Sequence, residues 1–223
     1  MGNLPPSIRA VVFDLDDTLY EEMEFVRGGM SAAAAFAASL GTGDAKSNYS
    51  RLMRILARDG RGKVFDVFLR GTPHDDPETV RRMVRAYREH PPRIRPCPDA
   101  IPALESIRSR GMLTGLITDG NAAVQRSKVA ALNIERLFDR IIYTDELGEG
   151  LSKPDPAPFV EMSGRLGLDP RRIAYVGDNP EKDFTGAKKI GWHTVRVLRG
   201  PHASAAPPPE LDAHERIESL TEI

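Results

Sequence analysis

The chain has 223 residues, of which 40% are hydrophobic and 28% are charged, and its formal net charge is −1. This composition is typical of a soluble globular protein, and the length suits one domain with an insertion or two small domains. A charge so close to zero provides no general attraction to nucleic acid or to an anionic membrane surface, so we expect neither as a partner.

Three features of the sequence bear on where the protein works. The single cysteine, Cys97, cannot form an internal disulfide, which is typical of a reducing compartment. No basic and then apolar secretory signal opens the chain. The longest weakly polar stretch, residues 30–40, is far shorter than the roughly 20 residues that span a bilayer. We therefore expect a cytoplasmic protein, and the sequence leaves open whether it is a monomer or a homodimer.

The first predicted element is a strand at residues 10–13, an apolar run typical of a strand buried on both faces. Directly after it, Asp14, Asp16 and Asp17 place three carboxylates within four positions. Ligands of open α/β sheets bind outside the carboxyl ends of the strands, so Asp14 and Asp16 are expected to project into one pocket. Two carboxylates a few Å apart repel by roughly 4 kcal/mol at an effective dielectric near 20. A hard cation, Mg²⁺ before Ca²⁺ or Zn²⁺, would relieve this repulsion, and the alternative interpretation is a solvated turn.

The region that follows this strand predicts helices and no strand. Helix formers or apolar residues at helical spacing mark four segments: 21–40, 49–58, 64–69 and 77–90. Prolines at four positions between 91 and 98 then indicate a stiff connector. We therefore expect residues 20–96 to form an all-helical cap domain.

From residue 99 onward, helices and strands alternate. The predicted helices are 100–109, 122–132, 156–166 and 181–189, and the predicted strands are 112–118, 140–143, 173–176, 193–197 and an edge strand within 215–220. Such alternation predicts a doubly wound (Rossmann-like) parallel sheet with helices on both faces. Residues 1–19 and 97–223 would form this α/β core. The cap, inserted at the carboxyl end of the first strand, is placed to act as a lid.

Polar residues also lie at the ends of two further predicted strands, 112–118 and 173–176, and directly before the helix predicted at 156–166. Four segments share this placement: 14–18 (DLDDT), 117–120 (ITDG), 152–155 (SKPD) and 177–183 (GDNPEKD). In type and order they resemble the four motifs of the haloacid dehalogenase superfamily. The helices expected between the first and second segments are similar to the inserted cap of that family.

The resemblance implies a role for each matching residue. Asp14 would be the nucleophile that attacks phosphorus and forms an aspartyl-phosphate. Asp16 would protonate the leaving oxygen and later deprotonate the attacking water. Thr118 and the backbone amide of Asp119 would bind the phosphoryl oxygens. Lys153 would neutralise the charge on Asp14 and on the phosphate.

The resemblance also implies a Mg²⁺ site. Its ligands would be the side chain of Asp14, the backbone carbonyl of Asp16 and Asp178, with Asp183 either a ligand or a residue that orients one. Elementary electrostatics favours the same residues, because a dianionic phosphate approaches a carboxylate only where positive charge compensates, and Mg²⁺ and Lys153 supply it. The expected protein is a Mg²⁺-dependent hydrolase of phosphoric monoester bonds that acts on a small phosphorylated metabolite.

Two positions depart from the common family pattern, and several alternatives stay open. Asp17 stands where the family often has Gly, and we expect it to turn outward or to cap the loop. Asp119 stands where Asn is common, and its carboxylate would weaken phosphate binding if it faced the site. A phosphotransferase or phosphomutase, or a binding protein that kept the fold without turnover, would carry similar motifs. Dehalogenation is disfavoured because it needs no acid/base carboxylate at Asp16.

Overall fold

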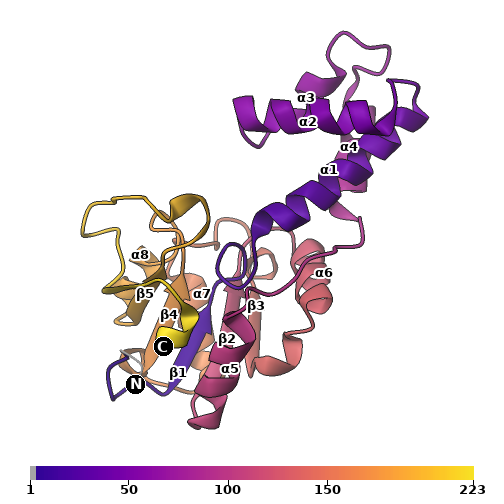
Figure 1. Cartoon of the computed structure of the whole chain (residues 1–223). Coiled ribbons are helices and arrows are strands. Elements are labelled where there is room, and N and C mark those ends of the chain that lie inside the picture. Colours follow the sequence, from indigo (N-terminus) through magenta and orange to yellow (C-terminus); the bar gives the residue numbers. More distant parts are fainter. Residues whose placement is uncertain (1–3) are drawn as a thin grey trace. The chain divides into compact units, whose positions relative to one another are not determined.

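The computed structural model describes residues 4–223. Contacts between residues divide the chain into two compact units. One consists of the N-terminal residues up to Glu22 together with Ile94–Ile223, and is named here the α/β unit. The other, Met23–Arg93, is named the helical unit (Figure 1). Within residues 4–223, no helix is both long enough and apolar enough to cross a membrane.

The described residues of the α/β unit contain a six-stranded sheet in which all paired strands run parallel. The strands are β1 (Ala10–Phe13), β2 (Leu113–Thr118), β3 (Arg140–Tyr143), β4 (Ile173–Gly177), β5 (His193–Val197) and β6 (Glu215–Ile217). Their order across the sheet is β3-β2-β1-β4-β5-β6, so the direction of strand addition reverses beside β1. The carboxyl ends of the paired strands β1 and β4 therefore border the crevice in which ligands of such sheets bind.

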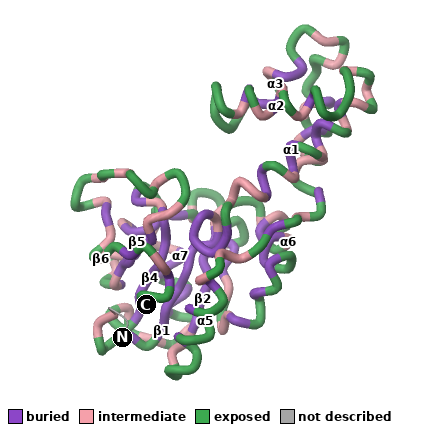
Figure 2. The backbone as a smooth tube through the Cα atoms, viewed as in Figure 1, coloured by how far each residue is buried: buried purple, intermediate pink, exposed green. Residues whose placement is uncertain are grey.

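Both faces of the sheet are covered, which explains why its strands are apolar runs. Val12 of β1 belongs to an apolar cluster with Met162 of α7 (Ala157–Leu166). Its neighbour Val11 is equally buried and points to the opposite face, because side chains alternate along a strand. That face is covered by α5 (Ala100–Ser109), as Figure 1 shows, and Figure 2 shows the strands as buried. The predicted doubly wound α/β architecture is confirmed.

The remaining elements of this unit connect the strands. The other α-helices are α6 (Ala122–Leu132) and α8 (Thr185–Lys189), and short 3₁₀ helices lie at Glu135–Leu137, Thr144–Glu146, Pro170–Arg172, Gly200–His202 and Leu220–Glu222. The helix that we expected at 181–189 begins only at Thr185. The reason is local: Asp183 and Asn179 form a tight turn, in which the Asp183 carboxylate accepts the backbone N–H of Asn179 at 2.9 Å.

The helical unit contains only helices and their connections between residues 23 and 93. Its helices are α1 (Glu22–Ser39), α2 (Ala45–Asp59), α3 (Val64–Leu69) and α4 (Pro77–Arg88). Met30, Phe68 and Met83 from three of them meet in one buried apolar cluster. A Cβ on Gly29 of α1 would lie 2.5 Å from the Tyr87 ring, so this glycine allows α1 and α4 to approach closely.

Candidate active site

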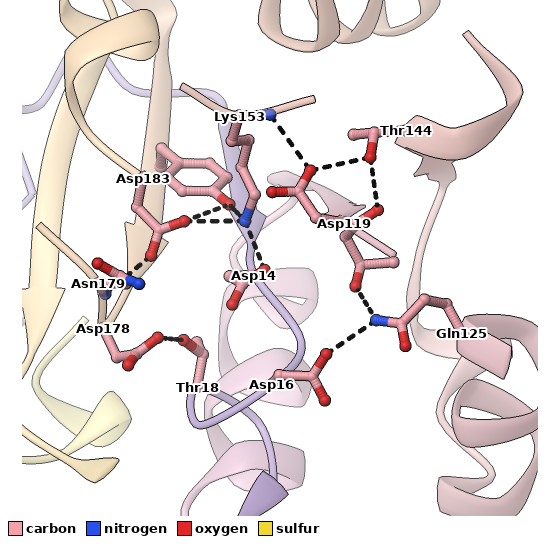
Figure 3. Close-up of polar contacts among 12 residues, drawn as sticks. Asp14, Asp16, Thr18, Asp119, Gln125, Thr144, Lys153, Asp178, Asn179 and Asp183 are labelled. Carbon is pink, nitrogen blue, oxygen red and sulfur yellow. Dashed lines mark hydrogen bonds and ion pairs between the residues drawn. The ribbon is translucent and has the colours of Figure 1, made fainter. Parts of the chain in front are cut away.

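Carboxylates from two neighbouring strand ends converge at the carboxyl edge of the sheet. Asp14 directly follows β1, and Asp178 directly follows β4. One side-chain oxygen from each of Asp14, Asp178 and Asp183 lies within 4.8 Å of the other two, and all three residues are buried (Figure 3). The structure therefore brings together the side chains of three of the four residues predicted to surround a metal ion.

A glycine makes this convergence possible. A Cβ placed on Gly177, the last residue of β4, would lie 2.3 Å from Oδ2 of Asp183. This distance is far below van der Waals contact, so with any other residue at position 177 either the Asp183 carboxylate or the end of β4 would have to move. The same carboxylate is held by the backbone N–H of Asn179. Asp183 is thus fixed by the turn that delays the start of α8.

Lys153, which precedes α7, supplies a buried positive charge among these carboxylates. Its Nζ donates to Asp14 Oδ1 at 2.6 Å, to Asp183 Oδ1 at 2.8 Å and to the Tyr175 hydroxyl at 2.8 Å. The side chain is only 3% exposed. Burial alone would lower the pKa of Lys153, but the two carboxylates outweigh it and raise the pKa well above its ordinary value. This side chain is therefore an ammonium at neutral pH.

One ammonium does not balance three buried carboxylates. Burial, together with Asp183 and Asp16, raises the pKa of Asp14 to about 8 against the opposing effect of Lys153. Burial and the nearby Asp183 and Asp14 raise the pKa of Asp178 to about 9. A donor set of carboxylate oxygens with excess negative charge fits a hard divalent cation, which would remove this electrostatic cost.

The side chain of Asp16 points in a different direction from that of Asp14. Its carboxylate points away from the three-carboxylate cluster (Figure 3) and is 23% exposed. Oδ1 accepts from Lys128 Nζ at 2.6 Å and from the Tyr20 hydroxyl, and Oδ2 accepts from Gln125 Nε2 at 2.9 Å. Burial raises the pKa of Asp16, but Lys128 and these hydrogen bonds outweigh it and hold the pKa below its ordinary value. The Asp16 side chain is thus outside the metal cluster, which leaves its backbone carbonyl as the predicted ligand.

Thr118 and Asp119 lie at the end of β2, beside β1. Thr118 is fully buried, and its hydroxyl oxygen accepts from Gln125. The carboxylate of Asp119 accepts from the Thr144 hydroxyl at 2.8 Å and from the backbone N–H of Lys153 at 3.2 Å (Figure 3). The Asp119 side chain therefore positions the loop that carries Lys153.

Asp17 is 8% exposed, so our expectation that it turns outward is wrong. Its Oδ1 accepts the backbone N–H of Glu22 at 2.9 Å, which is the capping alternative that the sequence also offered. Its φ of +54° lies in the left-handed region, which explains why glycine would suit this position.

Four polar side chains at the site were not predicted from the sequence. They are Tyr20, Gln125, Lys128 and Tyr175, each of which contacts Asp16 or Lys153. The available signal was weak: Gln125 and Lys128 are three positions apart and so share a face of the helix after β2. Nothing in the sequence marks that face as the buried one, since α6 carries small and apolar residues all round.

Comparison with known proteins identifies the class to which this fold and site belong. Residues 8–191 match the haloacid dehalogenase-like hydrolase family, and the chain belongs to that family, as its four motifs predicted. Two solved structures are similar over nearly the whole chain, each 26% identical in sequence. A 2-haloacid dehalogenase from Pseudomonas syringae has a TM-score of 0.67, and the match covers 96% of both chains. A HAD phosphatase from Thermococcus onnurineus has a TM-score of 0.65, and the match covers 96% of this chain and 95% of the other.

Curated relatives are more similar in sequence. The chain is 34% identical over 207 residues to a glyceraldehyde 3-phosphate phosphatase of Methanopyrus kandleri, in an alignment that covers 90% of this chain and 88% of the relative. It is also 33% identical over 147 residues to a phosphoserine phosphatase of Thermus thermophilus, in an alignment that covers 66% of this chain and 57% of the relative.

Proposed function

We propose that the protein is a Mg²⁺-dependent phosphatase that hydrolyses a small phosphorylated metabolite through an aspartyl-phosphate on Asp14. The observation that carries the proposal is the contact of Asp14 with the Lys153 ammonium, inside a cluster of buried carboxylates. Sequence similarity to curated phosphatases supports the same activity. A reducing cytoplasm is the compartment that suits the single cysteine.

The carboxylates of Asp14 and Asp178 and the backbone carbonyl of Asp16 are the groups that would hold Mg²⁺, with Asp183 beside them. When bound, the ion would compensate the negative charge of the phosphate and of the nucleophile. Asp183 also accepts from Lys153 Nζ at 2.8 Å, so it orients the ammonium. Its negative charge would in addition attract a cation held by Asp14 and Asp178.

The first chemical step follows from the placement of Asp14 and Asp16. The Asp14 carboxylate attacks phosphorus, and the bond from phosphorus to the ester oxygen breaks. Lys153 neutralises part of the charge that gathers at Asp14 and the phosphoryl group. The negative charge of a bound phosphate opposes the effect of Lys128 and raises the pKa of Asp16. The protonated form of Asp16, whose side chain is partly exposed, then gives its proton to the leaving oxygen.

The second step removes the phosphoryl group from Asp14. Asp16 now accepts a proton from water, which attacks phosphorus and releases inorganic phosphate together with the free Asp14 carboxylate. Throughout, the Thr118 hydroxyl and the backbone N–H of Asp119 are the donors that would hold the phosphoryl oxygens. The Asp119 carboxylate itself is held by the Thr144 hydroxyl and by the backbone N–H of Lys153.

The carboxylate at position 16 distinguishes phosphatase from dehalogenase chemistry, although solved structures of both kinds resemble this fold. An alkoxide leaving group needs a proton, whereas a halide ion leaves without one. We therefore favour a phosphomonoester substrate. Triose phosphates and phosphoserine are the first compounds to test, because relatives of this chain carry the names of phosphatases for them.

A panel of phosphorylated metabolites, assayed for inorganic phosphate with Mg²⁺ and with EDTA, tests the proposal. We expect release of phosphate that requires Mg²⁺ and is lost in Asp14→Asn. Turnover that continues in EDTA, or an active Asp14→Asn variant, would contradict it. A phosphotransferase or mutase would instead consume substrate without releasing an equal amount of inorganic phosphate.

A further inference from the structure

Two polar side chains on α6 are buried against the site although no motif includes them. Gln125 is 2% exposed and Lys128 is 4% exposed, and both contact the Asp16 carboxylate. When side chains alone are compared, that of Asp16 is 23% exposed and that of Lys128 is 5% exposed. The two α6 residues therefore lie behind Asp16, on its buried side, and contact it there.

Gln125 has a second contact that joins two parts of the site. Its Nε2 donates to Oδ2 of Asp16 at 2.9 Å (Figure 3). The same nitrogen also donates to the hydroxyl oxygen of Thr118. An amide nitrogen carries two hydrogens, so both bonds can form at once. One side chain thus connects the acid/base carboxylate after β1 with the phosphate-binding hydroxyl at the end of β2.

The direction of the bond to Thr118 has a chemical consequence. The Gln125 nitrogen can only donate, so the Thr118 hydroxyl oxygen must accept. A hydroxyl that accepts at its oxygen keeps its single hydrogen for another partner. In a site that binds phosphate, that hydrogen is available to a phosphoryl oxygen. A group that accepted at position 125 would instead occupy this hydrogen.

We propose that Gln125 is a positioning residue for the hydrolysis: its amide fixes the direction of the Asp16 carboxylate and leaves the Thr118 hydroxyl hydrogen free to be donated to phosphate. This inference rests on the proposed phosphatase function and adds to it a residue outside the four motifs. It predicts two separable defects when the amide is removed, one in leaving-group protonation and one in phosphate affinity.

The first defect is measured with two substrates in the presence of Mg²⁺. 4-Nitrophenyl phosphate has a leaving group that needs little protonation, whereas an alkyl phosphate needs the acid. In Gln125→Met we expect kcat for the alkyl phosphate to fall about tenfold more than kcat for 4-nitrophenyl phosphate, part of the roughly 10²–10⁴-fold that a general acid supplies. The matched control is Arg126→Gln, an exposed neighbour on the same helix, which should leave both rates unchanged.

The second defect is measured as inhibition by inorganic phosphate. Loss of one hydrogen bond of ordinary strength should raise the inhibition constant about fivefold in Gln125→Met and in Thr118→Val. Both changes remove the same hydrogen bond, the one from the Thr118 hydroxyl to phosphate. The inhibition constant of the double variant should therefore be little higher than that of either single variant, which is the non-additivity of a coupled pair. Independent effects that multiply in the double variant would overturn the Thr118 part of the inference.

Gln125→Glu provides a test that preserves size and shape. A carboxylate at this position accepts where the amide donates, and it also repels Asp16. We expect it to be at least as impaired as Gln125→Met on both measurements. If Gln125→Glu had the kcat values and the phosphate inhibition constant of the wild type, the hydrogen bonds donated by the Gln125 amide would have no role. This variant therefore tests the inference even if Gln125→Met fails to fold.

The outcomes separate this inference from the proposed function. If the wild-type protein releases no phosphate from any compound with Mg²⁺, the function fails and the inference fails with it. If the wild-type protein is active and Gln125→Met behaves like Arg126→Gln, the inference alone is overturned. An equal loss on both substrates, with unchanged phosphate inhibition, would indicate a merely structural residue and would also overturn it.

Discussion

Nζ of Lys153 lies 2.6 Å from Oδ1 of Asp14, although the two residues are 139 positions apart in the chain. The ammonium is held there from several sides, by Asp183, by the Tyr175 hydroxyl and by the Asp119 carboxylate, which accepts the backbone N–H of Lys153. A charge so fixed needs no reorganisation when negative charge develops on the nucleophile, which is the condition under which electrostatic stabilisation is most effective.

Replacing Lys153 should therefore abolish most of the turnover. In Lys153→Met we expect kcat/KM to fall about 10³-fold, the upper range for loss of one preorganised donor in a buried site. The matched control is Lys182→Met, because Lys182 is exposed and directly precedes Asp183 in the same motif. Its activity should stay near that of the wild type. Circular dichroism would verify that both variants fold, and substantial activity in a folded Lys153→Met would contradict the proposed role of the ammonium.

Metal binding should stabilise the α/β unit, because it would relieve the repulsion among Asp14, Asp178 and Asp183. A ligand present at about 100 times its Kd stabilises by about 2.7 kcal/mol, which corresponds to a rise in Tm of about 5–10 °C for a chain of this size. We expect Mg²⁺ to raise Tm in a thermal scan and EDTA to reverse the rise. In Asp178→Asn the Mg²⁺ effect should disappear, and an undiminished shift in that variant would place the ion elsewhere.

The close approach at Gly177 gives a more local test. In Gly177→Ala the new Cβ would meet Asp183 Oδ2 at 2.3 Å, so the carboxylate or the strand end must move. We expect a destabilisation of about 2 kcal/mol, typical of overpacking, together with weaker Mg²⁺ binding in a titration.

Gly164 on α7 is the matched control for this substitution. A Cβ there meets no atom within 4 Å, so Gly164→Ala should be neutral or stabilise the protein by about 0.5–1 kcal/mol. Equal effects of the two substitutions on Mg²⁺ affinity would show that the turn at Asp183 does not matter for the metal.

The sequence was sufficient to predict the sheet and the residues at its strand ends, because each depends on a short local pattern. An apolar run followed by Asp14, or by Asp178, indicates both a buried strand and the edge where it ends. The contacts of Gln125 and Lys128 with Asp16 join residues 109 and 112 positions apart, and they depend on which face of α6 is turned inward. That rotation is set by packing, which no local pattern encodes.

The direction of the Asp119 side chain also depends on contacts between distant residues, so no local sequence pattern predicts it. Its position in the second motif was evident, but the direction of its carboxylate depends on Thr144 and Lys153, which lie 25 and 34 positions away. The start of α8 was also misplaced, because Asn179 and Asp183 use their side chains and backbone to form a turn where helix formers alone predicted a helix.

The last prediction concerns pH and the C-terminal end of the chain. Asp99 accepts from Arg199 Nη1 at 3.2 Å, from the Ser219 hydroxyl at 3.0 Å and from the backbone N–H of Leu220 at 2.9 Å. Burial raises the pKa of Asp99, but these donors outweigh it and hold the pKa below its ordinary value. The ionised form is therefore favoured in the folded protein, and its contribution to stability is present above the unfolded pKa of about 3.9 and is lost as the pH falls through the folded pKa.

Asp99→Asn should accordingly lower the free energy of unfolding by about 2 kcal/mol near pH 7, the range for hydrogen bonds to a charged group. The difference from the wild type should shrink as the pH falls below about 4, because the wild-type carboxyl then becomes neutral as well. Urea unfolding at several pH values measures this difference. Asp66→Asn, at an exposed carboxylate of α3, is the control and should have a smaller effect at every pH. A difference for Asp99→Asn that stays constant down to about pH 3, below the unfolded pKa, would show that the charge of this carboxylate does not contribute.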